Sequence, residues 1–306
     1  MRWSMLIGGL VVLATTAAVA VSVLKPDAVG AAPSARDREL GKQLYDKQCA
    51  TCHGPAGRGD GPSAGGLATK PFDLSNGRLM NSLPDEFLVN VIRHGGPAEG
   101  LAPTMPPFDK FLSDTQTAQV IAYVRSLADP PFSASPPPLV HVAGAPRQPI
   151  FFNHVIHAGS FGIDCQYCHA DARRSEYAGL PSVSRCMGCH TIIGAQDNPE
   201  IQKIHGYAAR REAIPWVRVF KVPEFTYFPH KPHVRAGVAC QRCHGPVERM
   251  RVVGANTGQD LFVDLKRLVG LRPAPSPLTM GWCVDCHRAE NAKGAKAPLD
   301  CVTCHH

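Results

Sequence analysis

The amino-acid sequence predicts a mainly helical protein with much irregular structure. Three observations support this fold class. Apolar residues recur at helical spacing in several segments between residues 36 and 129. A short motif, C-x-x-C-H, recurs along the chain. In residues 150–306 its copies lie so close together that only loops and a few short helices fit between them.

The C-x-x-C-H motif is the attachment signature of a c-type haem, whose two cysteines form thioethers and whose histidine is one axial ligand. There are six copies: Cys49/Cys52/His53, Cys165/Cys168/His169, Cys186/Cys189/His190, Cys240/Cys243/His244, Cys283/Cys286/His287 and Cys301/Cys304/His305. They use all 12 cysteines of the chain. A zinc half-site or a redox dithiol explains a single C-x-x-C, but not six that are each followed by histidine. The sequence therefore predicts six covalently bound haem c groups.

The charge of the chain gives no support for a nucleic-acid partner. Its formal net charge is +7. Each ferric haem adds roughly one negative charge, because two propionates outweigh the single positive charge of the iron–porphyrin. The basic excess therefore mainly offsets the propionates. Haem c is attached on the oxidising, outer side of the bacterial membrane, so the chain must be exported.

The first 25 residues are predicted to anchor the chain in a membrane. An apolar run extends from Met5 to Leu24, and twenty helical residues would cover roughly 30 Å, the thickness of a hydrocarbon core. Arg2 before this run predicts a cytoplasmic N-terminus. The alternative is a cleaved signal peptide, because small residues ending at Ala20 and Ala32 resemble cleavage sites. The expected location is the periplasmic side of the bacterial inner membrane, with a single-pass N-terminal anchor.

Residues 36–129 are predicted to form a self-contained helical domain. The expected elements are a helix over 36–48, a Gly-rich loop over 54–66, a helix over 84–94 and a helix over 114–127. Pro84 favours the start of the second helix, and Gly95 favours its end. Ser113 or Asp114 is the expected cap of the third helix, whose apolar residues share one face.

This domain resembles a class I cytochrome c over its whole length. The resemblance rests on C-A-T-C-H-G over 49–54, M-P-P-F over 105–108 and I-A-Y-V-R-S-L over 121–127. It implies that His53 and Met105 are the two axial ligands, and that Gly41 lets the first and last helices cross closely. The alternative for Met105 is a core-filling side chain. His94 is interpreted as a surface or propionate-contacting residue rather than a ligand.

Residues 130–149 are rich in proline and are expected to form a semi-rigid linker, in which His141 is solvated. Residues 150–306 contain five motifs, which leaves too little apolar sequence for an ordinary core. We therefore expect a pentahaem domain whose porphyrins form the core, wrapped by loops and short helices. Close contact between neighbouring macrocycles suits electron transfer, whereas a catalytic haem generally needs an open iron.

Second axial ligands for this domain are expected among residues outside the motifs. Two F-x-H-x-x-H repeats each precede an attachment motif. In each repeat, one histidine is expected to serve its own downstream haem and the other a neighbouring haem. The fifth ligand is left open among Met280, which we favour, His205 and His306. The predicted iron ligands are thus His53, Met105, His169, His190, His244, His287, His305, His154, His157, His230, His233 and Met280.

The paired repeats resemble those of small multihaem cytochromes of the c3 and c7 kind. A longer resemblance, covering essentially all of 150–306, is to the pentahaem subunit of alternative complex III. It rests on G-I-D-C-Q-Y-C-H over 162–169, A-R-R-S over 172–175, C-M-G-C-H over 186–190, V-A-C-Q-R-C-H-G-P-V-E over 238–248 and L-T-M-G-W-C-V-D-C-H-R over 278–288. The resemblance implies a periplasmic subunit of a membrane quinol-oxidising complex, beside iron–sulfur and quinol-binding subunits. The class I domain in front departs from the family pattern, so the chain looks like a fusion.

Three function classes follow. The favoured one is a hexahaem electron-transfer subunit of a quinol:acceptor oxidoreductase of the alternative complex III type, which passes electrons from bis-His haems to the His/Met haem and on to a soluble or oxidase-bound acceptor. The second is an anchored multihaem carrier that serves another periplasmic reductase or extracellular electron transfer. The third is a multihaem enzyme, which is disfavoured because every haem can be given two ligands.

Overall fold

The computed structural model describes residues 33–142, 144–193, 196–255 and 278–305. The chain divides into two units, Met1–Pro33 and Ser34–His306. The membrane helix expected within residues 1–25 lies outside the described residues. Among the residues that are described, no helix is long and apolar enough to cross a membrane.

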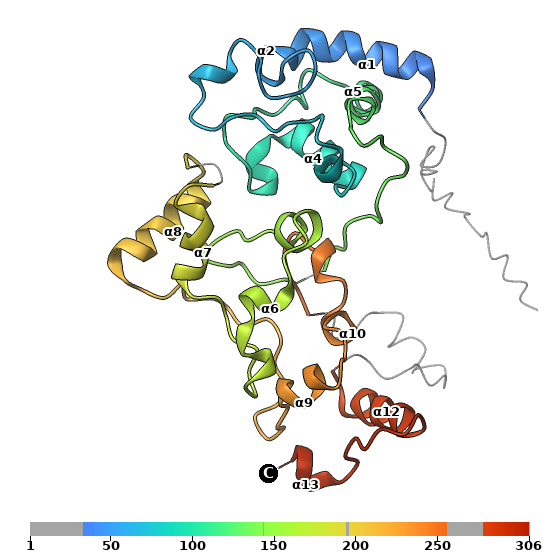
Figure 1. The fold of residues 1–306 in the computed structure, drawn as a ribbon, viewed down its shortest axis with the longest axis vertical. Helices are drawn as coiled ribbons and strands as arrows, with labels where there is room; N and C mark the ends of the chain where they lie inside the picture. The colour runs from blue at the N-terminus through green and yellow to red at the C-terminus, as the bar shows by residue number, and fades with distance from the viewer. Residues whose placement is uncertain (1–32, 143, 194–195, 256–277, 306) are drawn as a thin grey trace, which may run out of the picture. The chain divides into compact units, whose positions relative to one another are not determined.

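The first part of the larger unit is helical, as the sequence predicts (Figure 1). Its elements are α1 (Ala35–Gln48), α2 (Ala50–His53), η1 (Ala64–Gly66), α3 (Gly77–Met80), α4 (Asp85–His94), η2 (Gly96–Glu99) and α5 (Asp114–Ser126). Ser34 and Ser113 each close a capping box at the start of a long helix, which satisfies backbone N–H groups that have no partner within the helix. Pro84 is the N-cap of α4, so this helix begins one residue later than expected.

A conventional apolar core holds this part together. Tyr45, Phe87 and Val120 are at most 2% exposed, and they come from α1, α4 and α5. Helices α1 and α5 cross at Gly41, where an added Cβ would lie 1.9 Å from the Gln119 carbonyl oxygen. The close crossing implied by the class I resemblance is therefore present, and it depends on the missing side chain.

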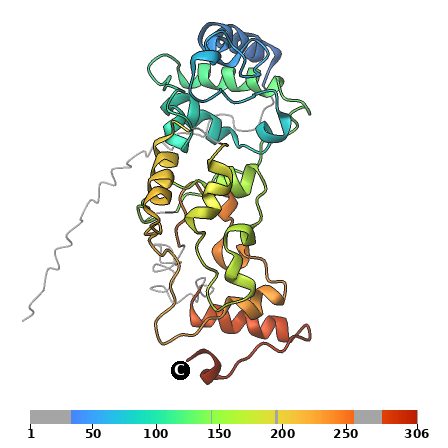
Figure 2. The same cartoon turned by 60° about the vertical axis from the view of Figure 1, so that its left-hand side comes forward.

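The second part contains short helices joined by irregular segments (Figures 1 and 2). Its elements are the π-helix η3 (Val155–Ser160), α6 (Cys165–Cys168), η4 (Ala170–Arg173), α7 (Val183–His190), α8 (Pro199–Arg210), α9 (His230–Arg235), α10 (Gln241–His244), η5 (Val247–Arg249), α12 (Met280–Asn291) and α13 (Cys301–Cys304). A small cluster around Ile150, Ile204 and Ile214 is its main buried apolar group in the described residues. A mainly helical fold with much irregular structure is confirmed, and the described residues form no β-strand.

The Pro-rich segment is attached to both parts of the larger unit. Leu139 is 7% exposed and packs into the core of the first part. The Val140 N–H donates to the Arg249 carbonyl oxygen at 2.8 Å, and the Arg249 guanidinium donates to the Pro138 carbonyl oxygen at 2.7 Å. These contacts hold the Pro-rich segment to both parts, and Arg249 binds a proline carbonyl oxygen of that segment. Residues 34–306 form one compact unit.

We predict that Gly41→Ala destabilises the chain by about 1–3 kcal/mol, because the new methyl group forces α1 away from the backbone of α5. Thermal unfolding of the haem-loaded protein measures the loss. The matched control is Gly65→Ala, since nothing lies within 4 Å of a Cβ at Gly65. Equal melting temperatures for the two variants would contradict the role assigned to the crossing.

Candidate haem-binding sites

A cavity of about 2380 Å³ connects the two parts of the larger unit. Its lining includes four of the six attachment motifs, which begin at Cys49, Cys165, Cys186 and Cys240. Met105 and all four histidines of the two F-x-H-x-x-H repeats also line it. None of the twelve cysteines, which all lie in described residues, forms a disulfide. These residues, predicted to attach and ligate haem, therefore surround shared space, which fits several adjacent porphyrins.

The last two attachment motifs do not line this cavity. The predicted site residues outside its lining are Cys283, Cys286, His287, Cys301, Cys304, His305 and Met280. Cys286 is half-buried in α12, and its Sγ accepts a hydrogen bond from the Arg242 guanidinium at 3.5 Å. This contact places Cys286 beside α10, outside the lining of the cavity. Haem attachment at Cys286 stays a prediction from the sequence.

The first site combines a histidine at the end of α2 with a methionine held by the turn after α4. The Met105 carbonyl oxygen accepts from the Gly96 N–H at 2.9 Å, and the Met105 N–H donates to the Ala102 carbonyl oxygen at 3.3 Å. His53 Nδ1 lies 3.3 Å from the Phe72 carbonyl oxygen. Burial lowers the pKa of His53, which favours the neutral imidazole that binds a metal.

Backbone carbonyl groups hold most of the predicted histidine ligands in one tautomer. A carbonyl oxygen only accepts, so a ring nitrogen beside it must carry the proton and the opposite nitrogen is left with a lone pair. The Nδ1–O distances are 3.3 Å for His53, 3.0 Å for His157, 2.7 Å for His169, 3.1 Å for His190, 2.7 Å for His230, 2.9 Å for His233, 2.6 Å for His287 and 3.3 Å for His305. In all eight, Nε2 is the nitrogen available to iron.

Three pairs of rings have the separation required by a shared iron. Metal–nitrogen bonds of about 2 Å place the centres of two opposed imidazoles roughly 6 Å apart. The observed ring-centre distances are 6.0 Å for His157–His190, 6.3 Å for His230–His244 and 5.9 Å for His233–His287. Each pair joins one histidine of a repeat to one histidine of an attachment motif. Each pair would hold the iron of one haem.

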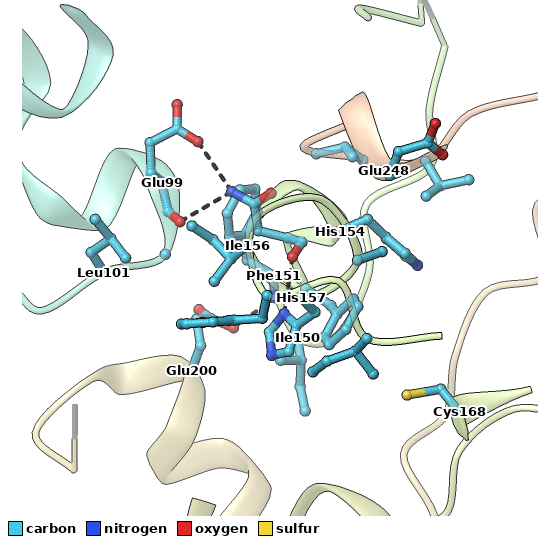
Figure 3. Close-up of a pocket in the computed structure, with 18 of the residues that line it drawn as sticks. Glu99, Leu101, Ile150, Phe151, His154, Ile156, His157, Cys168, Glu200 and Glu248 are labelled. Carbon is cyan, nitrogen blue, oxygen red and sulfur yellow. Dashed lines mark hydrogen bonds between the residues drawn. The ribbon is translucent and has the colours of Figure 1, made fainter. Parts of the chain in front are cut away.

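The remaining repeat histidine, His154, is assigned to the iron of His169. Burial, followed by the neighbouring His169 and then His157, lowers the pKa of His154 to about 4. His154 and His157 point in different directions from the same turn, as Figure 3 shows. Within the described residues, His154 Nδ1 is buried without a hydrogen-bond partner. That each repeat serves two different haems stays a prediction.

A phenylalanine holds both histidines in each repeat. Phe152 contacts His154 at 4.8 Å and His157 at 4.3 Å between ring centres. Phe228 contacts its two histidines at 5.1 Å and 4.6 Å in the same order. In both repeats the first contact is edge-on, while the second ring lies closer to parallel. The shared geometry explains why phenylalanine begins both repeats.

The sites of the second part form a continuous series. For four thiols, burial is the largest cause of a raised pKa and a cysteine of another motif is the next cause that raises it. The neighbours are Cys186 beside Cys168, Cys165 beside Cys240, Cys243 beside Cys283, and Cys283 beside Cys304. The motifs that begin at Cys186, Cys165, Cys240, Cys283 and Cys301 are therefore adjacent in this order.

The three candidates for the fifth ligand differ in what the structure shows. His205 faces the His190 carbonyl oxygen through Nε2 at 2.9 Å, so this nitrogen carries a proton and is not free to ligate. Met280 begins α12 and is 66% exposed. His306 lies outside the described residues. Met280 stays our prediction, with His306 as the alternative.

The histidines interpreted as non-ligands lie away from the ring pairs. His94 is exposed at the end of α4. His141 is exposed and pairs with Glu86 of α4, so it is not simply a solvated linker residue. Sequence reasoning also missed Trp216, whose buried Nε1 has no partner among the described residues although its side chain lines the cavity. An unpartnered donor at this place suits a haem propionate.

Comparison with known proteins finds different families for the two parts of the chain. Residues 36–124 match a family described as cytochrome c oxidase, cbb3-type, subunit III. Residues 226–306 match a family described as cytochrome c7 and related cytochrome c. The chain is a multihaem c-type cytochrome.

Relatives of this cytochrome occur in quinone-linked complexes. It is 27% identical over 167 residues to the menaquinone reductase multihaem cytochrome c subunit of Nitratidesulfovibrio vulgaris, covering 52% of this chain and 77% of that one. It is 28% identical over 171 residues to the cbb3-type cytochrome c oxidase subunit FixP of Sinorhizobium medicae, covering 52% and 50%. It is 37% identical over 91 residues to the cytochrome c subunit of the quinone alcohol dehydrogenase of Gluconacetobacter polyoxogenes, covering 28% and 18%.

We predict that His154→Ala produces one high-spin haem per chain, because the variant leaves one iron without its distal ligand. Carbon monoxide should bind the reduced variant stoichiometrically, and absorption spectroscopy measures this. His205→Ala is the matched control and should remain low-spin and bind no carbon monoxide, since His205 Nε2 is occupied by the His190 carbonyl. If His205→Ala gives the high-spin haem and His154→Ala does not, then His205 and not His154 is an iron ligand.

Proposed function

We propose that this cytochrome carries six haem c groups and relays electrons within a membrane quinol:acceptor oxidoreductase of the alternative complex III type. One observation supports the relay above all: the sites are adjacent along a single compact unit, and four of them share one cavity at the junction of its two parts. Bound haem c supplies a one-electron redox centre at each site. The likeness to subunits of a menaquinone reductase and a quinone alcohol dehydrogenase supports a quinone-linked complex. Quinol as the electron source is proposed from the sequence resemblance to alternative complex III.

The protein residues in this proposal bind and orient the groups and do not catalyse a reaction. Four pairs of histidines would each hold one iron, and His53 with Met105 would hold the first. A multihaem enzyme needs an iron with an open position, and ligand pairs of this kind leave none at these sites. We therefore propose an electron-transfer subunit that is not itself a catalyst.

The proposed direction runs from the second part to the first. A methionine ligand raises the potential of a haem relative to two histidines. The bis-His sites belong to the second part, whereas His53 and Met105 belong to the first. We propose that electrons enter the second part from the partner complex, reach the site of His157 and His190, and leave through the site of His53 and Met105. The first part then docks the acceptor, which is a soluble protein or an oxidase.

Partners and location follow from the same proposal. The chain would bind iron–sulfur and quinol-binding subunits on the periplasmic side of the bacterial inner membrane, held there by a helix within residues 1–25. The match of residues 36–124 to a cbb3 oxidase subunit favours a second candidate, an anchored cytochrome that delivers electrons to an oxidase or another reductase. Purification from native membranes separates the two: co-purifying iron–sulfur and quinol-binding subunits support the first candidate, and oxidase subunits alone support the second.

We predict that Met105→His lowers the potential of the first haem by roughly a hundred millivolts or more, since axial ligands spread haem potentials over about 0.8 V. Electron delivery to the acceptor should slow, while quinol still reduces the other five haems. Redox titration and stopped-flow reduction of the whole complex measure the two effects. His141→Ala is the control, because it removes an exposed histidine that pairs with Glu86. If the first haem of the native protein proves lower in potential than the others, the proposed direction is wrong.

A further inference from the structure

Glu99 is a buried carboxylate at the junction of the two parts of the larger unit. It ends η2, the turn that follows α4, and its exposure is 0%. It also lines the cavity beside the turn that carries His154 and His157 (Figure 3). Burying a carboxylate costs free energy unless hydrogen bonds or an ion pair compensate for the lost water. The residues that bond Glu99 therefore indicate its role.

Both parts of the chain supply partners for this carboxylate. The Asn90 amide of α4 donates to Oε1 at 2.5 Å. The Asn153 amide, from the second part, donates to Oε2 at 3.1 Å and to the Glu99 carbonyl oxygen at 3.2 Å. Arg251, also from the second part, places Nε 2.9 Å from Oε2. Burial raises the pKa of Glu99, while Asn90, Arg251 and Asn153 oppose this effect. Arg251 is the one charged side chain paired with it among the described residues.

Asn153 connects Glu99 to a proposed iron ligand. While its amide nitrogen binds Glu99, its backbone carbonyl oxygen accepts from His157 Nδ1 at 3.0 Å. Its side-chain oxygen accepts from the Val155 N–H at 2.9 Å, which fixes the start of the turn. Asn153 therefore bonds the first part of the chain and the His157 ring at the same time.

The second repeat shows that ligand orientation alone does not need asparagine. Pro229 occupies the equivalent position, and its carbonyl oxygen accepts from His233 Nδ1 at 2.9 Å. Proline has no side-chain amide, so that repeat makes no bond of the Glu99 kind. The side-chain amide of Asn153 is therefore not needed to orient the histidine. Its partner is instead the Glu99 carboxylate of the first part.

We infer that Glu99 is a positioning residue for electron transfer between the two parts, acting through Asn153 to fix the docking of the first part and the ring of His157. This inference rests on the proposed function, because it takes His157 and His190 as ligands of the haem next to the first part. Asn198 adds support from the same side, since its amide donates to the carbonyl oxygens of Gly100 and Leu101 at 2.7 and 3.1 Å.

The test compares Glu99→Ala, Glu99→Gln and Asn153→Ala in the full haem-loaded chain. Glu99→Ala and Asn153→Ala should each slow electron transfer between the second part and the His53/Met105 haem by about tenfold or more. The reason is that one charged hydrogen bond shifts the docking equilibrium of the two parts by about that factor. Both should also change the electron paramagnetic resonance signal of the His157/His190 haem, which reports ring orientation. The double variant should be no slower than either single variant, because both remove the same link.

Glu99→Gln tests position separately from charge. The Asn90 amide can rotate to present its oxygen to the new glutamine nitrogen, so the bond to Asn153 survives. This variant should keep the native rate and resonance signal while the potentials of the nearest haems rise. Glu86→Gln is the control, since it changes an exposed carboxylate of α4.

The outcomes distinguish this inference from the proposed function. If the native chain passes no electrons between its parts, the proposed function fails. If the native chain does so and both alanine variants match it in rate and resonance signal, the positioning role of Glu99 is wrong. If Glu99→Ala does not fold, Asn153→Ala and Glu99→Gln decide, because a slow glutamine variant would show that the charge and not the position matters.

Discussion

The hydrogen bond from histidine Nδ1 to a backbone carbonyl is the interaction on which the arrangement of the sites depends. It keeps the proton on Nδ1 and leaves the lone pair of Nε2 free to bind the iron. Because the acceptor belongs to the backbone, the irregular loops between motifs have a definite role, which is to bring a carbonyl group to the right histidine. A chain with few buried apolar side chains can thus hold its ligands in fixed orientation without long helices.

The two parts of the chain differ in how far their sequences predict them. In the first part, serine caps, apolar periodicity and Gly41 are local signals, and the structure has α1, α4 and α5 within one residue of the expected bounds. In the second part, the four repeat histidines were recognisable, but their partners were not. Pairing His157 with His190 depends on how loops fold back on one another, and spacing along the chain does not encode this.

The residues that sequence reasoning missed share a physical cause. Glu99, Asn153 and Arg251 are ordinary polar residues whose importance arises only when segments about 50 to 150 residues apart meet. A comparison of the two repeats carried the one available signal, since Asn153 in one stands where Pro229 stands in the other. The contact of the Pro-rich segment with Arg249 could not be read from the sequence for a similar reason, because Arg249 lies far along the chain from Pro138.

The turn that carries His154 and His157 has a consequence for biogenesis. In the proposed assignment each repeat contributes to two different irons, so the insertion of one porphyrin would complete part of the pocket for the next. Maturation of residues 150–306 is then cooperative: a missing cofactor removes a partner from its own histidine and leaves the shared turn without one of its two anchors. A cell that attaches too few haems would accumulate unstable chains open to proteolysis rather than a graded set of partly loaded carriers.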